Sequence, residues 1–323
     1  MITINQIGIS LLISIVVFFL YQKVATIIDD YRYQSIGKLV DVGGYQLHIH
    51  STGEGGPAVI LDAGLSGTSL GWFLVQSEVS KFTQVCSYDR AGYAWSDESL
   101  SKRTCNNLAE ELHILLHKAN IPSPYILVGH SFGGGNMLMF ADMYPEETLG
   151  VVLVDSVHEE MLQALPIEPQ GIVNRLVCHP NFQWLLSIMS YKRLKGPSAE
   201  ILKMFKPLPE KIKLMYFAQM NKTSYIKTVS REMEDLKESL CQLCENKIHL
   251  QEKPLIVITA GKFSNSEEAK LWNGLQKRLL LKSNRAKQLV AENSDHMINH
   301  HQPEIITEAI REIWNNQSLV ERK

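Results

Sequence analysis

The sequence predicts an α/β fold, with a mostly parallel central sheet that helices cover on both faces. Short runs of continuously apolar residues alternate along the chain with segments that repeat apolar residues at helical spacing. A continuous apolar run suits a strand that is buried on both faces, as in a parallel sheet. The chain has 323 residues, 45% of them apolar, and a net charge of −2. This composition allows a sizeable core and does not indicate a nucleic-acid-binding surface.

An apolar stretch near the N-terminus, residues 7–21, precedes the first predicted strand. It is slightly shorter than the ~20 residues that a membrane-spanning helix needs, and the flanking Ile2 and Val24 could extend it. No Lys or Arg comes before Lys23 and no clear small-x-small site follows, which disfavours a cleaved signal peptide. We therefore expect residues 1–30 to form a single-pass membrane anchor. Basic residues follow the stretch and predict a domain on the cytoplasmic side: Lys23, Arg32 and Lys38.

The remaining elements follow in order from residue 36. Gly43-Gly44 separates two alternating segments, KLVDV and YQLHIHSTG, and indicates a hairpin. Periodic apolar residues predict a helix over 104–119, a second helix from Ser131 to about Met143, and a final amphipathic helix over 302–316. Buried strands are expected at 57–64, 83–89, 125–130, 150–155, 254–261 and 286–292.

The rhythm of strands stops between residues 156 and 253, where helical patterns occur at 209–220 and 224–240. An insertion of this length predicts a helical cap over about 158–252, just before the penultimate strand. Open α/β sheets bind ligands at the carboxyl edge, so we expect the cap to shape a substrate pocket. The whole α/β domain is expected to span 36–316, and residues 317–323 are expected to form a polar tail.

Gly129-His130-Ser131-Phe132-Gly133 is a G-x-S-x-G motif between a predicted strand and a predicted helix. A nucleophile at the tip of a strand needs a turn so tight that the residues two before and two after it crowd each other, which favours Gly129 and Gly133. The first N–H groups of the following helix favour negative charge there. A phosphate-binding glycine loop is the competing interpretation, but no P-loop lysine follows. The motif favours Ser131 as a nucleophile.

A serine nucleophile needs a base, and the sequence offers 11 histidines. His296 lies in a polar loop after the last predicted strand, at the same sheet edge as Ser131. His130 adjoins the serine and is expected to point away from it, whereas His158 lies near the edge and stays an alternative. Six more fall in elements away from that edge or at the start of the last helix: His48, His50, His113, His117, His300 and His301.

Four stretches together resemble the capped, small-molecule branch of the α/β-hydrolase superfamily, over roughly residues 38–316. The resemblance implies the α/β-hydrolase fold, with Ser131 as nucleophile and His296 as general base. It also implies an oxyanion hole made by the backbone N–H groups of Phe132 and Leu65. The stretches are GHSFGG at 129–134, LDAGLSGTSLGW at 61–72, SYDRAGYAWSD at 87–97, and the spacing of His296 and Pro303.

The chain departs from the family pattern at two places. Asp62-Ala63-Gly64-Leu65 stands where the family usually has His-Gly, but backbone groups would still form the hole. The loop after strand 254–261 lacks the aspartate that usually completes the triad. Asp155, at the end of the preceding strand, is the favoured acid over a simple turn-capping role. Glu267 is the alternative acid.

Two further groups of residues are expected to be structural. Asp89 and Arg90 are expected to hold their turn near the site through an ion pair or backbone hydrogen bonds. The five cysteines do not have the pattern of a disulfide framework. No second C-x-x-C or H-x-x-x-H completes a set of four zinc ligands with Cys241 and Cys244. We interpret those two thiols as surface residues of a helix.

The resemblance implies a serine hydrolase that cleaves carboxylic esters of small or lipid-like molecules through an acyl-enzyme on Ser131, without cofactor or metal. Epoxide hydrolase and haloalkane dehalogenase chemistry would need a carboxylate nucleophile, which the serine argues against. The alternatives are an amidase or aminopeptidase of the same fold, and a non-catalytic binding module. The expected partners are the ester substrate and a membrane, with no nucleic acid, and the oligomeric state stays open.

Overall fold

The computed structural model describes residues 4–161, 190–262 and 266–320 and builds the domain around one eight-stranded sheet. The strand order is β1-β2-β4-β3-β5-β6-β7-β8. The first two strands form the predicted hairpin, β2 pairs antiparallel with β4, and all further pairs are parallel. The strands are β1 (Lys38–Asp41), β2 (Gln46–Thr52), β3 (Ala58–Asp62), β4 (Val85–Tyr88), β5 (Tyr125–His130), β6 (Thr148–Val154), β7 (Pro254–Ala260) and β8 (Arg285–Ala291). The predicted α/β fold is confirmed.

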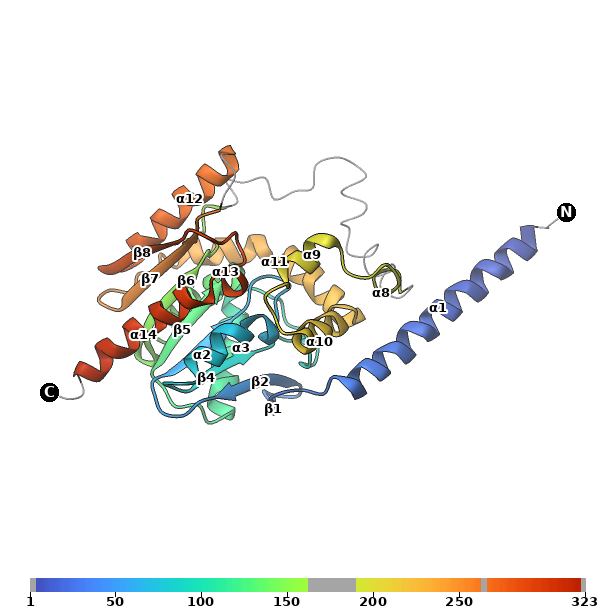
Figure 1. Cartoon of the computed structure of the whole chain (residues 1–323), viewed down its shortest axis with the longest axis horizontal. Coiled ribbons are helices and arrows are strands. Elements are labelled where there is room, and N and C mark those ends of the chain that lie inside the picture. Colours follow the sequence, from blue (N-terminus) through green and yellow to red (C-terminus); the bar gives the residue numbers. More distant parts are fainter. Residues whose placement is uncertain (1–3, 162–189, 263–265, 321–323) are drawn as a thin grey trace.

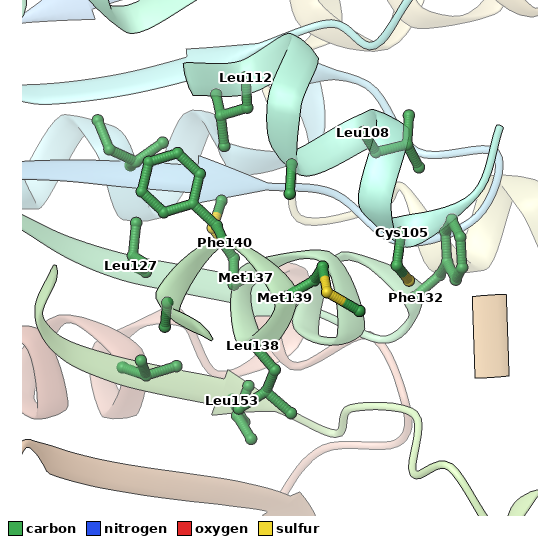
Figure 2. Close-up of a cluster of buried hydrophobic side chains, with 14 of the residues drawn as sticks. Cys105, Leu108, Leu112, Leu127, Phe132, Met137, Leu138, Met139, Phe140 and Leu153 are labelled. Atoms are coloured by element: carbon green, nitrogen blue, oxygen red, sulfur yellow. The ribbon is translucent and has the colours of Figure 1, made fainter. Parts of the chain in front are cut away.

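Helices cover both faces of the sheet (Figure 1). One face packs against α3 (Cys105–Lys118), α4 (Phe132–Met143), α11 (Thr223–Glu245) and α12 (Glu267–Leu279). The other face packs against α2 (Phe73–Val79) and α14 (Pro303–Val320). Figure 2 shows the first layer, where Leu127 of β5 and Leu153 of β6 meet side chains of α3 and α4. Because successive residues of a strand point to opposite faces, these continuous apolar strands supply both layers.

The cap follows β6. Its described helices are α8 (Tyr191–Lys195), α9 (Ala199–Met204), α10 (Glu210–Met220) and the first part of α11. The helices predicted at 209–220 and 224–240 correspond to α10 and α11, whereas residues 162–189 of the predicted cap lie outside the described residues. Two short elements complete the domain near the site, η1 (Ser69–Trp72) and α13 (Ile298–His301).

The first and last helices are both longer than the sequence predicted. Helix α14 continues to Val320, so 317–320 of the predicted polar tail are helical, since polar residues can extend a helix without adding to its apolar face. The first helix, α1 (Ile4–Arg32), continues past the apolar stretch 7–21. Its segment Gly8–Arg32 is long and apolar enough to cross a membrane, a property that signal sequences share.

The described part of α1 touches the domain at its C-terminal end (Figure 1). The side chain amide of Gln22 donates to the carbonyl of Asn221 at 2.6 Å. Two carboxylates of α1, Asp29 and Asp30, form ion pairs with Arg193 and Lys222 of the cap region. The C-terminal part of α1 therefore lies beside the cap, and the rest of the helix extends away from the domain (Figure 1).

Candidate active site

Ser131 stands at the sharp turn between β5 and α4. Its backbone has φ +53° and ψ −120°, a strained conformation for a residue with a side chain. Its N–H donates to Val154 O at 3.0 Å, and its carbonyl accepts from the N–H groups of Gly134 and Val157, both at 3.1 Å. The end of β6 thus fixes this turn on both sides.

The glycines around the serine are required by close backbone contacts. A Cβ on Gly129 would lie 2.4 Å from the carbonyl oxygen of Gly133, as the predicted crowding demands. A Cβ on Gly133 would meet a different group, the carbonyl oxygen of Asp62 at 2.5 Å. Gly64, which the sequence did not single out, lies so close that its Cβ would be 3.0 Å from the Cβ of Ser131. The turn therefore packs directly against the end of β3.

His296 and Asp155 are joined by a short hydrogen bond. His296 Nδ1 lies 2.6 Å from Asp155 Oδ2. The carboxylate is fully buried, whereas the imidazole is 42% exposed. Asp155 Oδ1 also accepts from Trp272 Nε1 at 3.1 Å and from Ala260 N at 3.2 Å. With Nδ1–H donating to the carboxylate, Nε2 of His296 is left as a proton acceptor.

Glu267, the alternative acid, is not brought to His296. Its side chain is 82% exposed and pairs with Lys270 one turn further along α12. His158 is buried beside Glu159 and does not line the cavity that holds Ser131. Of the predicted residues, the structure brings together Ser131, His296 and Asp155.

His130 supports the loop that carries His296. Its Nε2 donates to the backbone carbonyl of His296 at 2.8 Å, and the two rings lie 4.7 Å apart. Burial lowers the pKa of His130 well below its usual value, and the neighbouring His296 lowers it further. From the sequence we expected only that His130 points away from Ser131. The contact with His296 could not be predicted, because 166 residues separate the two histidines.

Ser131 and His296 line one cavity of about 330 Å³ at the carboxyl edge of the sheet. Leu65 and His130 also line it, and the cap covers it with Ile201, Met204, Phe205, Tyr216, Met220 and Tyr225. A larger hollow of about 740 Å³ lies at the opposite, amino edge, between the starts of β6, β7 and β8. We place the site in the smaller cavity, because that cavity contains the strained serine and the paired histidine.

Arg90 ties the loop after β3 to the cap. Its guanidinium is buried and donates to Asp62 Oδ1 at 2.6 Å, to Ala63 O at 2.6 Å and to Gly64 O at 2.9 Å. Its Nε donates to Glu232 of α11 at 2.7 Å. The predicted structural role of Arg90 therefore includes both an ion pair and backbone hydrogen bonds. Glu232 was missed, because a single acid in a charged helix carries no signal of burial.

Asp89 belongs to a second network beside Arg90. It accepts hydrogen bonds from His48 Nδ1 at 2.7 Å and from the N–H of Ser69 at 2.7 Å. In the network of Arg90, the hydroxyl of Tyr93 donates to Glu232 Oε2 at 2.8 Å and so helps to hold Glu232 of the cap in place. These buried polar groups pair with one another, as burial requires.

Comparisons with known proteins agree with this architecture. The profile of a family described as alpha/beta hydrolase fold matches residues 57–186. The chain is 24% identical over 282 residues to the uncharacterized protein YqjL of Bacillus subtilis, which covers 86% of this chain and 91% of that protein. It is 23% identical over 287 residues to an AB hydrolase superfamily protein of Gibberella zeae, with 80% and 86% covered. The Cif epoxide hydrolase of Acinetobacter nosocomialis has a similar structure, with a TM-score of 0.69, 14% identity, and 91% and 96% covered.

Proposed function

The chain belongs to the α/β-hydrolase superfamily, and from that premise we propose that it is a membrane-anchored serine hydrolase that cleaves carboxylic esters of small or lipid-like molecules. One observation carries the proposal. The strained Ser131 lines the same cavity as His296, whose Nδ1 lies 2.6 Å from the buried carboxylate of Asp155. A hydroxyl, an imidazole and a carboxylate in this order are the parts that acyl transfer to serine needs.

In the proposed reaction, Ser131 Oγ attacks the ester carbonyl while His296 Nε2 takes its proton. Asp155 stabilises the imidazolium and holds the ring in orientation. The tetrahedral intermediate collapses when His296 returns the proton to the leaving alkoxide, which departs as an alcohol. Water then attacks the acyl-enzyme with His296 again as base, and the carboxylic acid leaves Ser131 free.

Two peptide groups are proposed as the oxyanion hole. The carbonyl of Gly64 accepts from Arg90, and in a trans peptide the N–H of Leu65 then points the opposite way. The carbonyl of Ser131 is likewise held by Gly134 and Val157, so the N–H of Phe132 points away from them. Because α4 begins at Phe132, this N–H has no acceptor within the helix. Such donors contribute about 3 kcal/mol each to transition-state stabilisation.

The walls of the cavity support an apolar acyl group. Met204, Phe205 and Met220 of the cap face the cavity of Ser131. A second cavity of about 250 Å³ shares Ile201, Met220 and Tyr225 with it and extends to α8. A longer acyl chain could extend past these shared apolar side chains toward the second cavity, whose outer wall also carries Lys192 and Lys195.

The position of α1 supports the lipid-like part of the proposal. Gln22, Asp29 and Asp30 join α1 to the cap, so an α1 that spans a membrane would hold the cap beside the lipid surface. The basic residues Lys23, Arg32 and Lys38 favour the cytoplasmic side for the domain. Esters drawn from that leaflet would then reach the cavity through the cap.

The proposal is tested with the full chain in detergent micelles and a ladder of p-nitrophenyl esters of increasing acyl length. We expect turnover that prefers medium or long acyl chains and disappears in Ser131→Ala. Ser77→Ala, which changes an exposed serine on α2, is the matched control and keeps the activity. Turnover of p-nitroanilides in place of esters would move the activity to amides. Turnover that persists in Ser131→Ala would contradict the proposal.

A further inference from the structure

Three side chains gather at the amino edge of the sheet, on the opposite edge from the cavity of Ser131. His113 and His117 lie on α3, and Glu147 lies in the short helix η2 (Pro145–Glu147) that leads into β6. His113 Nε2 is 2.9 Å from Glu147 Oε1, and His117 Nε2 is 3.1 Å from the same oxygen. Two imidazoles therefore direct the same ring nitrogen toward one carboxylate.

The spacing of the two histidines is suited to chelation. Residues four apart on a helix lie on the same face, so His113 and His117 can act on one ion without rearranging α3. The three possible ligand atoms lie within 4.8 Å of one another. The ring of Tyr144 stacks on His113 at 3.8 Å with an interplanar angle of 2°, which fixes the imidazole in its direction.

The charge and exposure of the cluster also suit a cation. Glu147 supplies the negative charge of the cluster, and the Nε2 atoms of both His113 and His117 lie within hydrogen-bond distance of its carboxylate. His117 is 56% exposed while Glu147 is 21% exposed, so one side of the cluster is open to water. That opening provides a path for an ion and room for water ligands.

We propose that His113, His117 and Glu147 bind one zinc ion, with water completing the coordination. Two imidazole nitrogens and one carboxylate oxygen form a ligand set that zinc accepts, and the ion would replace the N–H protons that now face the carboxylate. The site joins α3 to the connection between α4 and β6, so the bound ion stabilises the amino edge of the sheet. Hydrolysis at the opposite edge does not depend on it.

This inference changes the expectation that the chain uses no metal. His113 and His117 form an H-x-x-x-H pair in the sequence, but that pair was considered only as a complement to Cys241 and Cys244 in a set of four zinc ligands, which it does not complete. The third ligand is 30 residues further along the chain from His117. Only the fold brings Glu147 back to α3, so the pair alone gave an incomplete set of ligands.

The test is zinc binding by the full chain in detergent, measured by calorimetry and by competition with a chromophoric chelator. The exposed thiols Cys241 and Cys244 could also bind zinc, so the measurement is made in a Cys241→Ser/Cys244→Ser background. His117→Asn removes one ligand, and His249→Asn changes an exposed histidine outside the cluster as the matched control. Thermal unfolding with and without zinc gives a second readout that does not depend on hydrolysis.

We expect one equivalent of zinc to bind in the serine background and in His249→Asn, with a zinc-dependent rise in Tm. In His117→Asn the affinity is expected to fall by roughly tenfold or more, and the rise in Tm at the same zinc concentration to shrink accordingly. Cobalt should give the absorption of a nitrogen and oxygen site, without thiolate charge transfer. No binding in the serine background, or unchanged binding in His117→Asn, would overturn the proposal.

Discussion

Arg90 and Glu232 form a buried ion pair that joins the core of the domain to the cap. Arg90 Nε lies 2.7 Å from Glu232 Oε1, and Arg90 Nη2 lies 3.1 Å from Glu232 Oε2. The same guanidinium holds the carbonyls of Ala63 and Gly64 beside Ser131. A single side chain therefore couples the position of α11 to the peptide that we propose as part of the oxyanion hole.

Glu232→Ala is expected to lower both stability and kcat. It removes one of the two buried carboxylates that pair with Arg90 and leaves Asp62 as the other, and breaking a buried ion pair costs about 3–5 kcal/mol. The released guanidinium would also loosen the loop at Gly64. Urea unfolding and ester turnover measure the two effects. Glu234→Ala, an exposed acid on the same helix, should change the free energy of unfolding by no more than ~0.5 kcal/mol. Equal losses of stability and of ester turnover in Glu232→Ala and Glu234→Ala would contradict the coupling of the cap to the active site through Arg90 and Glu232.

Asp155→Asn is expected to lower kcat by about 10⁴-fold with little change in stability or substrate binding. The amide would hydrogen-bond to His296 in the wrong tautomer and could not stabilise the imidazolium. Steady-state kinetics on the preferred ester provide the measurement, with Glu267→Gln as the paired variant. Because Glu267 is exposed, its substitution should leave kcat nearly unchanged. A large loss of kcat in Glu267→Gln and a small one in Asp155→Asn would identify Glu267 of α12 as the acid of the triad.

Gly133→Ala is expected to prevent folding or to destabilise the domain severely. Its Cβ would lie 2.5 Å from Asp62 O and 2.6 Å from Ala63 O, and neither backbone group can move without shifting the end of β3. Gly274→Ala in α12 is the matched control, because its Cβ would have no atom within 4 Å. That control should gain about 0.5–1 kcal/mol from the helix preference of alanine. Thermal unfolding measures the stability of both variants. A Gly133→Ala protein that unfolds at the temperature of the unchanged protein would contradict the close packing of Gly133 against the end of β3.

Stability is expected to fall with acidification because of His300. Burial lowers its pKa from 6.5 to about 4, so the folded state resists protonation more than the unfolded chain does. The unfolded state binds more protons between these two values, and stability therefore rises with pH across this window. The contribution is about 1.4 kcal/mol per pH unit inside the window. Urea unfolding from pH 4 to 7 should show a shallower slope in His300→Gln than in His249→Gln. Identical slopes in the two variants would mean that His300 titrates alike in both states.

The sheet and the nucleophile turn could be predicted because their signals are local. Continuous apolar runs such as 125–130 mark strands buried on both faces, and G-x-S-x-G places two glycines where a Cβ has no room. Asp155 was favoured as the acid because it ends a strand at the carboxyl edge and the loop after strand 254–261 has no aspartate.

Contacts between distant elements could not be predicted in the same way. Glu232 meets Arg90 across 142 residues, and it lies in a helix whose other glutamates are exposed. The His130 contact to the His296 carbonyl spans 166 residues. Such pairs depend on how the cap and the last loop dock, and neither composition nor periodicity encodes that docking.

The most direct test of the account is labelling of the full chain with a fluorophosphonate, followed by mass spectrometry of the modified peptide. The account predicts one adduct, on Ser131, since only an activated serine attacks phosphorus rapidly. Labelling should be lost in Ser131→Ala and strongly slowed in His296→Ala, while Ser77→Ala labels normally. An adduct on another serine, or no adduct on a protein that unfolds cooperatively and is therefore folded, would contradict the assignment of Ser131 as the nucleophile.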